Sequence, residues 1–347
     1  MSKSTVDENN ELTLLTARPS SLYRDAWLRL RKNKMAFISL IIVGFYFFVC
    51  IITPLLPLSY DNQVLEHKFL PPSFRKAGEL AYEKRETFFT ALAQKQNRQL
   101  NENEISQLTE LKEAIVSDPV HGKIYLLGTD GLGRDMLARL IYGGRISIMV
   151  GIVGSLTAVL IGMILGALAG YKGGKTDRVI VVSMEVLYSL PYMLIVIIFM
   201  ALFGQNLINL FIAIALISWL TQARVVRGQV MSLKNSGFVE AARMMGASSW
   251  YVIRRHLIPN CLNIMIVFAS MDVPVFILQE SFLSYLGLGV SAPLASWGTL
   301  IKDGVDNMHL YSWLLIVPAF TMGLFLFAMN FLGDGLREAF DPKGKNV

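Results

Sequence analysis

Acidic residues in apolar surroundings are the first feature of this sequence that could do chemistry. Glu185, Asp272 and Glu280 lie in or near long stretches of mostly apolar residues. A charged side chain at the centre of a membrane helix costs about 2.5–3.5 kcal/mol on insertion scales, so it should face protein or a water-filled cavity. Glu185 and Asp272 could line a translocation path or relay protons, or they could form buried hydrogen bonds that fix helix packing. For Glu280, near the outer end of its stretch, the packing role is favoured.

A polar segment between two apolar stretches is the second such feature. It reads EAARMMGASSWYVIRRHLIPN and covers residues 240–260. Ser236 is suited to cap a short helix, Gly246 to end it, and a following serine to cap a second helix that stops before Pro259. Such a helix–turn–helix between two membrane spans could receive force from a partner protein. It could equally be an amphipathic loop at the membrane surface.

The tetrapeptide GGKT at 173–176 resembles the end of a phosphate-binding loop. That motif needs Gly, four residues, then Gly-Lys-Ser/Thr, but Ala169 stands where the first glycine belongs and an apolar stretch precedes it instead of a strand. We therefore expect a tight turn with glycines at positive φ, and no nucleotide site. If transport uses ATP, another chain must hydrolyse it. The four histidines show no metal-ligand spacing, so we expect no metal site. The spans hold no paired catalytic constellation, so we expect no catalytic residue either.

The elements that must position these residues are membrane helices. Of 347 residues, 53% are hydrophobic and 17% are charged, whereas about a quarter are charged in soluble domains. A spanning helix needs about 20 mostly apolar residues. Six stretches qualify, at 35–56, 146–170, 179–203, 207–223, 262–286 and 311–332. The sequence thus predicts an all-α membrane protein with six transmembrane helices.

Lysine and arginine set the expected orientation. They gather before the first stretch, in the second-to-third and fourth-to-fifth connections, and after the last stretch, while 204–206 has none and 287–310 has only Lys302. Because basic residues favour the cytoplasmic side, both termini are expected in the cytoplasm. The net charge of +6 is then a topology signal, and we expect no nucleic-acid partner.

Several spaced motifs resemble those of ABC importer permeases. Glu240, Ala241 and Ala242, with Gly246 four residues later and Pro259 thirteen after Gly246, resemble the EAA loop of that family; His256 stands where an aliphatic residue is frequent. Further blocks resemble the dipeptide/oligopeptide/nickel branch, namely GTDGLGRD, GYKGGKTD, ESFLSYLGLGV and GDGLREAFDPK. Within that branch the chain is most similar to the second (C-type) permease subunit of oligopeptide importers. The resemblance covers nearly the whole chain from Arg24 on, except the enlarged first outer loop.

The resemblance implies a type I ABC importer permease fold in the bacterial cytoplasmic (inner) membrane. It implies a homologous second permease subunit, two ATPase subunits that bind ATP and Mg, and an extracytoplasmic solute-binding protein that delivers oligopeptides or dipeptides. This chain itself would bind no cofactor and would not be an enzyme.

The resemblance also assigns an ATPase-coupling set: Phe238, Glu240, Ala241, Ala242, Arg243, Met245 and Gly246. Glu240 is expected to make a charged contact with the ATPase, Gly246 to allow the turn, and apolar residues near Phe238 and Met245 to fill a groove. Glu185 and Asp272 remain the candidates for the translocation path.

The resulting domain organisation has five parts. They are a cytoplasmic tail at 1–34, a first helix at 35–57, an enlarged and partly helical extracytoplasmic loop at 58–145, a five-helix core at 146–334 with a coupling loop at 224–260, and a cytoplasmic tail at 335–347. The long loop is either a small cap or a contact surface for an outer partner.

Two other function classes remain open. A secondary transporter driven by an ion gradient would place mid-membrane acids within an inverted repeat, and no convincing repeat of the halves is visible. An intramembrane enzyme ranks last, because the spans hold no paired catalytic constellation at helical spacing. The substrate is also open, since peptides, nickel chelates and other small solutes all fit.

Overall fold

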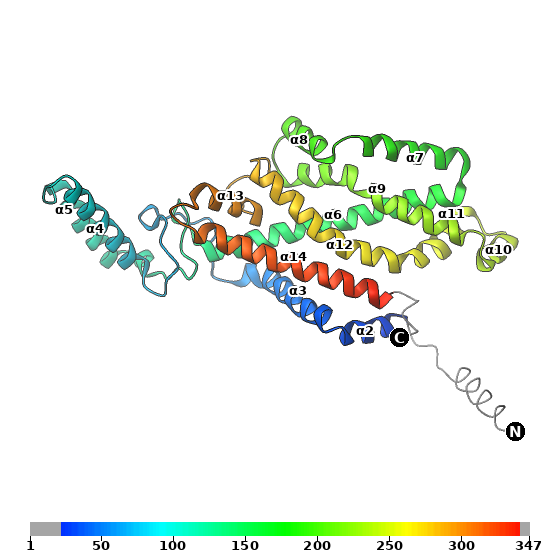
Figure 1. Cartoon of the computed structure of the whole chain (residues 1–347), viewed down its shortest axis with the longest axis horizontal. Helices are drawn as coiled ribbons and strands as arrows, with labels where there is room; N and C mark the ends of the chain where they lie inside the picture. The colour runs from blue at the N-terminus through cyan, green and yellow to red at the C-terminus, as the bar shows by residue number, and fades with distance from the viewer. Residues whose placement is uncertain (1–21, 341–347) are drawn as a thin grey trace, which may run out of the picture.

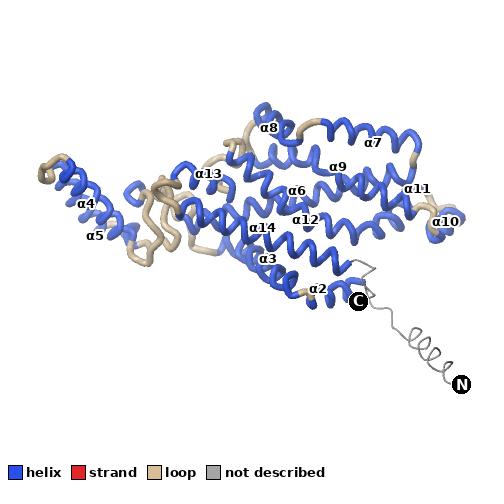
Figure 2. The backbone as a smooth tube through the Cα atoms, in the orientation of Figure 1, coloured by secondary structure: helices blue, strands red, loops and turns tan. Residues whose placement is uncertain are grey.

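The computed structural model describes residues 22–340, and every regular element among them is a helix (Figures 1 and 2). Two isolated β-bridges join loop residues within this part of the chain. Within residues 22–340, five stretches are long and apolar enough to cross a membrane. They are Lys34–Leu55 (α3, Lys34–Ile52, with η1, Thr53–Leu55), α6 (Met136–Lys172), α9 (Leu207–Leu233), Ser249–Tyr285 and α14 (Trp313–Phe340). The predicted all-α membrane fold is confirmed, and parts of both predicted tails, 1–21 and 341–347, lie outside the described residues.

The third predicted span, 179–203, is broken. It consists of α7 (Gly174–Ser189) and α8 (Tyr192–Phe203), which are bent by 83°. Leu190, between them, is extended with φ −92° and ψ 138°. Pro191 follows, and proline disfavours the helical region for the residue before it. The prediction of one continuous helix here was wrong for that local reason.

Helix α6 begins at Met136, ten residues before the predicted apolar stretch. Asp135 caps it by accepting from the backbone N–H of Leu137 at 2.9 Å. The early turns carry Arg139, whose guanidinium bonds Asp130 Oδ2 at 2.5 Å and Asp303 Oδ2 at 3.3 Å. Because these carboxylates offset the charge, the helix can continue beyond the apolar residues that hydropathy detects.

Helix α9 likewise runs past its predicted end at 223. Arg227, in the added part, forms a bidentate pair with Asp177 of α7 at 2.5 and 2.7 Å. The predicted coupling loop at 224–260 therefore begins with helix and becomes a separate structure only after Leu233.

Helices α6 and α9 pack closely along a face of small residues. A Cβ added at Gly162 would lie 2.5 Å from Gln222 Cβ, and one added at Gly170 would lie 2.8 Å from the Arg227 carbonyl oxygen. Glycine spaced every four residues permits this approach. Gly162, Gly166 and Gly170, spaced four residues apart on α6, all lie at this contact with α9. The turn that follows is as predicted, with φ of 64° at Gly173 and 55° at Gly174.

A helical hairpin projects from each end of the bundle (Figure 1). The outer hairpin is formed by α4 (Ala77–Lys95) and α5 (Glu102–Ser117), between η2 (Leu65–His67) and η3 (Pro119–Gly122). The inner hairpin is formed by α10 (Gly237–Met244) and α11 (Ser249–Val252). Helix α13 (Trp297–Asn307) lies at the outer end, whereas α2 (Leu22–Lys32) and the end of α14 lie at the inner end (Figure 1). Which side of the membrane each end faces stays a prediction from the basic residues.

Candidate functional site

The inner hairpin turns at Gly246. This residue has a φ of +81°, and open space surrounds the position a Cβ would take. L-residues with a side chain rarely adopt this conformation. Ser248 then caps α11 by accepting from the Tyr251 N–H at 3.3 Å. Ser236 occupies the cap position of α10, but its hydroxyl donates to the Leu233 carbonyl oxygen at 2.6 Å instead of capping.

The second helix of the hairpin does not stop before Pro259, as the sequence suggested. After α11 the chain makes a π-helical turn, η4 (Ile253–Leu257), and continues directly into α12 (Ile258–Tyr285). Pro259 is the second residue of α12, which follows directly after this turn. The wide π turn ahead of it relieves the crowding that proline causes within an α-helix. The hairpin is therefore continuous with a membrane span.

The inner hairpin has one face that is buried against the bundle and one face that is exposed. Five apolar side chains are buried against the bundle: Val239, Ala242, Val252, Ile253 and Leu257. Five others are exposed: Phe238 (41%), Met244 (84%), Met245 (82%), Trp250 (53%) and Tyr251 (53%). Ala242, a member of the coupling set that the resemblance assigns, therefore faces the bundle and not the exposed surface. Met244 and Tyr251, which the structure exposes, were missed because neither helix is long enough for periodicity to define its faces.

The charged residues of the hairpin differ in their partners. Arg243 donates from Nε to the Tyr171 hydroxyl at 3.1 Å, and its guanidinium lies 4.9 Å from the centre of that ring. Arg243 is thus attached to the end of α6. Glu240 and Ala241 are exposed. Among the described residues no hydrogen bond or ion pair reaches the Glu240 carboxylate, so this charge is available to a partner.

A cavity of about 320 Å³ lies beside the break between α7 and α8, with α9 and α12 forming its other walls. Asp272, near the middle of α12, lines it and accepts a hydrogen bond from Gln222 Nε2. Glu185 is exposed on α7 and is not among the lining residues. The structure thus separates the two acids that the sequence grouped together.

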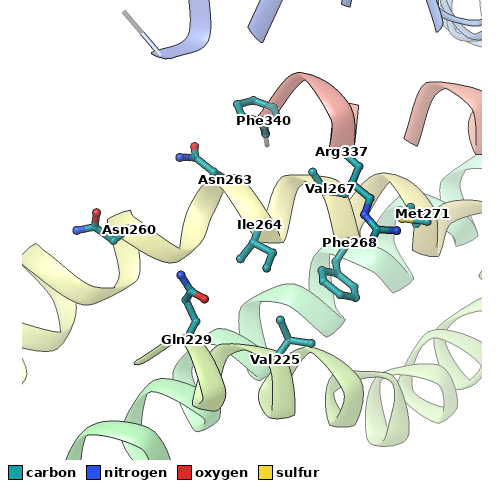
Figure 3. A pocket seen from close by; sticks show the side chains of 10 residues that line it. All are labelled: Val225, Gln229, Asn260, Asn263, Ile264, Val267, Phe268, Met271, Arg337 and Phe340. Carbon is teal, nitrogen blue, oxygen red and sulfur yellow. The ribbon is translucent and has the colours of Figure 1, made fainter. Parts of the chain in front are cut away.

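A larger cavity of about 650 Å³ lies nearer the inner end (Figure 3). It is lined by α9, α12 and the last turns of α14, with Gln229 facing Asn260 and Asn263 across the space (Figure 3). Gln222 and Gln229 lie on one face of α9, because residues seven apart nearly align on a helix. Gln222 lines the first cavity and Gln229 the second, so this α9 face passes through both.

Glu280 has the packing role that the sequence favoured. It is fully buried. Its carboxylate accepts from the Ser284 hydroxyl at 2.6 Å and from the Ser147 hydroxyl of α6 at 3.3 Å. Ser147 also accepts from the Trp297 N–H of α13 at 3.1 Å. Glu280 thereby ties three helices together at the outer end and does not line either of the two cavities.

Comparisons with known proteins identify two family matches. Residues 162–346 match the family described as binding-protein-dependent transport system inner membrane component. Residues 21–72 match the N-terminal TM domain of oligopeptide transport permease C. The outer hairpin lies between the two matched segments.

Individual relatives cover different shares of the chain. The oligopeptide transport system permease protein OppC of Haemophilus influenzae is 52% identical over 221 residues, covering 64% of this chain and 71% of the relative. The dipeptide transport system permease protein DppC of Bacillus subtilis is 39% identical over 339 residues, covering 97% of this chain and 91% of the relative. Among solved structures, the MetNI methionine ABC transporter in inward-facing conformations aligns with a TM-score of 0.48 at 17% identity, over 59% of this chain and 97% of that chain.

Proposed function

Because this chain belongs to the family of binding-protein-dependent transport system inner membrane components, we propose that it is one of two similar permease subunits in an importer of oligopeptides or dipeptides. Family membership confirms the predicted ABC importer permease and its place in the inner membrane, and it decides against the secondary transporter. The peptide substrate is supported by the names of relatives that cover nearly all of this chain.

The inner hairpin is proposed to dock on a cytoplasmic ATPase subunit. Its exposed side chains combine one carboxylate without a partner, Glu240, with apolar groups such as Phe238 and Met245. An apolar patch bordered by charge is the usual composition of a protein interface. ATP and Mg would be bound and ATP hydrolysed on the partner ATPases, and this chain would transmit the resulting movement.

One observation carries this proposal, namely the continuity between the hairpin and the spanning helix. α11, η4 and α12 form an unbroken helical stretch from Ser249 to Tyr285. A displacement of the hairpin must therefore move α12. This helix carries Asp272, which lines the cavity beside the break between α7 and α8. Force applied at the ATPase can reach the path through a single continuous helical element.

The two cavities are proposed as segments of the translocation path. Both lie on the α9 and α12 walls, and a second permease subunit would close their open sides. The solute-binding protein would deliver peptide at the α13 end. For Glu185 a path role stays a prediction that rests on its position in an apolar helix; unchanged uptake and stability in Glu185→Gln would remove it.

The coupling role is tested by co-purifying the permease pair with its ATPase subunits. Glu240→Lys reverses the free charge and should reduce ATPase recovery at least tenfold while leaving the permease folded. Gly246→Ala should cost about 1 kcal/mol at its positive φ and lower ATP-driven uptake. Gly228→Ala is the matched control, because its added Cβ also meets open space but its φ is not positive. Normal ATPase recovery and normal uptake in both hairpin variants would contradict the proposed coupling.

A further inference from the structure

The cavity beside the break between α7 and α8, called the mid-membrane cavity below, has unpaired hydrogen-bond acceptors on its walls. Asp272 receives one bond, from Gln222 Nε2. The other amide atom of that residue, Gln222 Oε1, is buried without a partner, and so is Ser218 Oγ. Gln222 is only 2% exposed, and both residues line the cavity. A buried polar atom without a partner is costly, so these atoms are suited to a ligand that supplies donors.

The remaining polar groups of the cavity are already paired with each other. The Tyr188 and Thr221 hydroxyls are 2.8 Å apart, and the Tyr192 hydroxyl donates to Gln279 Oε1 at 2.8 Å. The Arg224 guanidinium stacks 4.6 Å from the centre of the Tyr188 ring. Among residues 22–340, no lysine or arginine forms an ion pair with Asp272. The cavity thus holds a carboxylate whose charge no cation of the described chain balances.

A positively charged donor fits this arrangement. An ammonium group has three N–H donors and no acceptor. Asp272, Gln222 Oε1 and Ser218 Oγ offer it an anion and two uncharged acceptors. Once a second permease subunit closes the open side of the cavity, attraction between the ammonium and the carboxylate is much stronger than in bulk solvent.

The spacing along α12 indicates what is attached to the ammonium. Gln279 lies two turns from Asp272 on the same face, about 10 Å along the helix axis at 1.5 Å per residue. Gln279 Nε2 is a donor that suits a peptide carbonyl oxygen. An extended peptide spans about 3.3–3.6 Å per residue, so three residues cover this distance.

We propose that Asp272, with Gln222 and Ser218, binds the free amino terminus of a transported peptide in the mid-membrane cavity. This inference rests on the proposed function and adds a substrate feature to it, a preference of the permease itself for an unblocked amino terminus. Gln279 holds a carbonyl oxygen about three residues further along.

The test measures direct peptide binding to the purified complex of permease pair and ATPases, without the binding protein. The probes are radiolabelled trialanine and N-acetyl-trialanine. The wild-type complex should bind trialanine at least tenfold more tightly than the acetylated peptide. Asp272→Asn should abolish that preference, whereas Asp334→Asn, the same change at an exposed position of α14, should retain it. Ser218→Ala makes a smaller change and should weaken trialanine binding several-fold even if Asp272→Asn fails to assemble.

The outcomes separate this inference from the proposed function. Equal binding of the two peptides by the wild type, or an undiminished preference in both Asp272→Asn and Ser218→Ala, would overturn the amino-terminus site. ATP-driven uptake of trialanine in proteoliposomes with the binding protein is measured in parallel. Uptake without any amino-terminus preference would leave the peptide importer standing and remove only the site. No uptake of any peptide by the wild type would instead refute the proposed substrate class.

Discussion

The two hairpins are both pairs of helices joined by a short turn, but they differ in how their charged side chains are paired. The outer hairpin closes on itself at its tip: Arg98 pairs with Glu104 at 2.7 and 2.8 Å, and Asn101 and Glu104 form a capping box. The inner hairpin leaves Glu240 unpaired and exposes Met245. In the outer hairpin the Glu104 carboxylate is paired within the hairpin, whereas in the inner hairpin the Glu240 carboxylate is exposed and unpaired.

Their cores differ in the same way. The outer hairpin is anchored by a small separate cluster of Leu70, Ala77, Ala81 and Tyr125. The inner hairpin shares its cluster with residues of α6, α9 and α12. Since packed interiors transmit displacement, the inner hairpin must move with the bundle, whereas the cluster of the outer hairpin contains no residue of the spanning helices. This shared packing is what the proposed coupling role of the inner hairpin requires, and secondary structure alone does not reveal it.

The largest expected effect concerns the buried face of the inner hairpin. Ala242→Asp places a charge at a position that is 3% exposed, and an unpaired buried charge costs about 3–5 kcal/mol. Ala241→Asp is the matched control on the exposed face and should cost less than about 1 kcal/mol. Thermal unfolding of the detergent-solubilised permease measures both. Similar melting temperatures for the two variants would show that the hairpin is not packed on the bundle.

The next effect concerns the outer hairpin and pH. His67 is buried and its ring nitrogens lie 2.8 Å from His121 Nδ1 and 3.2 Å from the Tyr125 hydroxyl oxygen. Burial, and then the neighbouring His121, lowers the pKa of His67 to about 4. In the unfolded chain the pKa of histidine is about 6.5. The contribution of neutral His67 to folding stability is therefore fully present above pH ~6.5. It is lost as the pH falls toward 4, because the unfolded segment binds the proton more readily than the folded one.

At pH 5 this should destabilise the outer hairpin by about 1–2 kcal/mol. Hydrogen exchange of residues 77–122 at pH 7 and pH 5, corrected for the intrinsic exchange rates, measures the change. His67→Gln should show a weaker pH dependence than the wild type. Equal protection at both pH values in the wild type would contradict a buried neutral His67.

The smallest expected effect on stability comes from replacing one exposed aromatic residue on each hairpin. Phe238→Ser and Phe88→Ser each remove an exposed aromatic ring, 41% and 62% exposed respectively. Each should change the free energy of unfolding by less than about 0.5 kcal/mol. Only Phe238→Ser should reduce recovery of the ATPase subunits on co-purification. A comparable loss with Phe88→Ser would remove the functional distinction between the hairpins.

Patterns along the chain predicted the spans and the place of the turn at Gly246. They failed at α7 and α8, because hydropathy averages over Pro191 and cannot register a bend of 83°. They also failed at the end of the hairpin, where Pro259 was taken as a stop and a π turn instead carries the helix onward. Both errors concern backbone geometry that depends on a few residues and on their packing.

The sequence by itself determined the apolar spans, the expected orientation and the spacing of the coupling segment, because each follows from residue type and position along one chain. Only the tertiary structure decided that Asp272 lines a cavity while Glu185 is exposed, and that Ala242 is buried while Ala241 faces outward. Neighbouring or similar residues acquire different roles when helices from distant parts of the chain pack against one of them and not the other. Burial and partnership are properties of that packing, and no local pattern contains them.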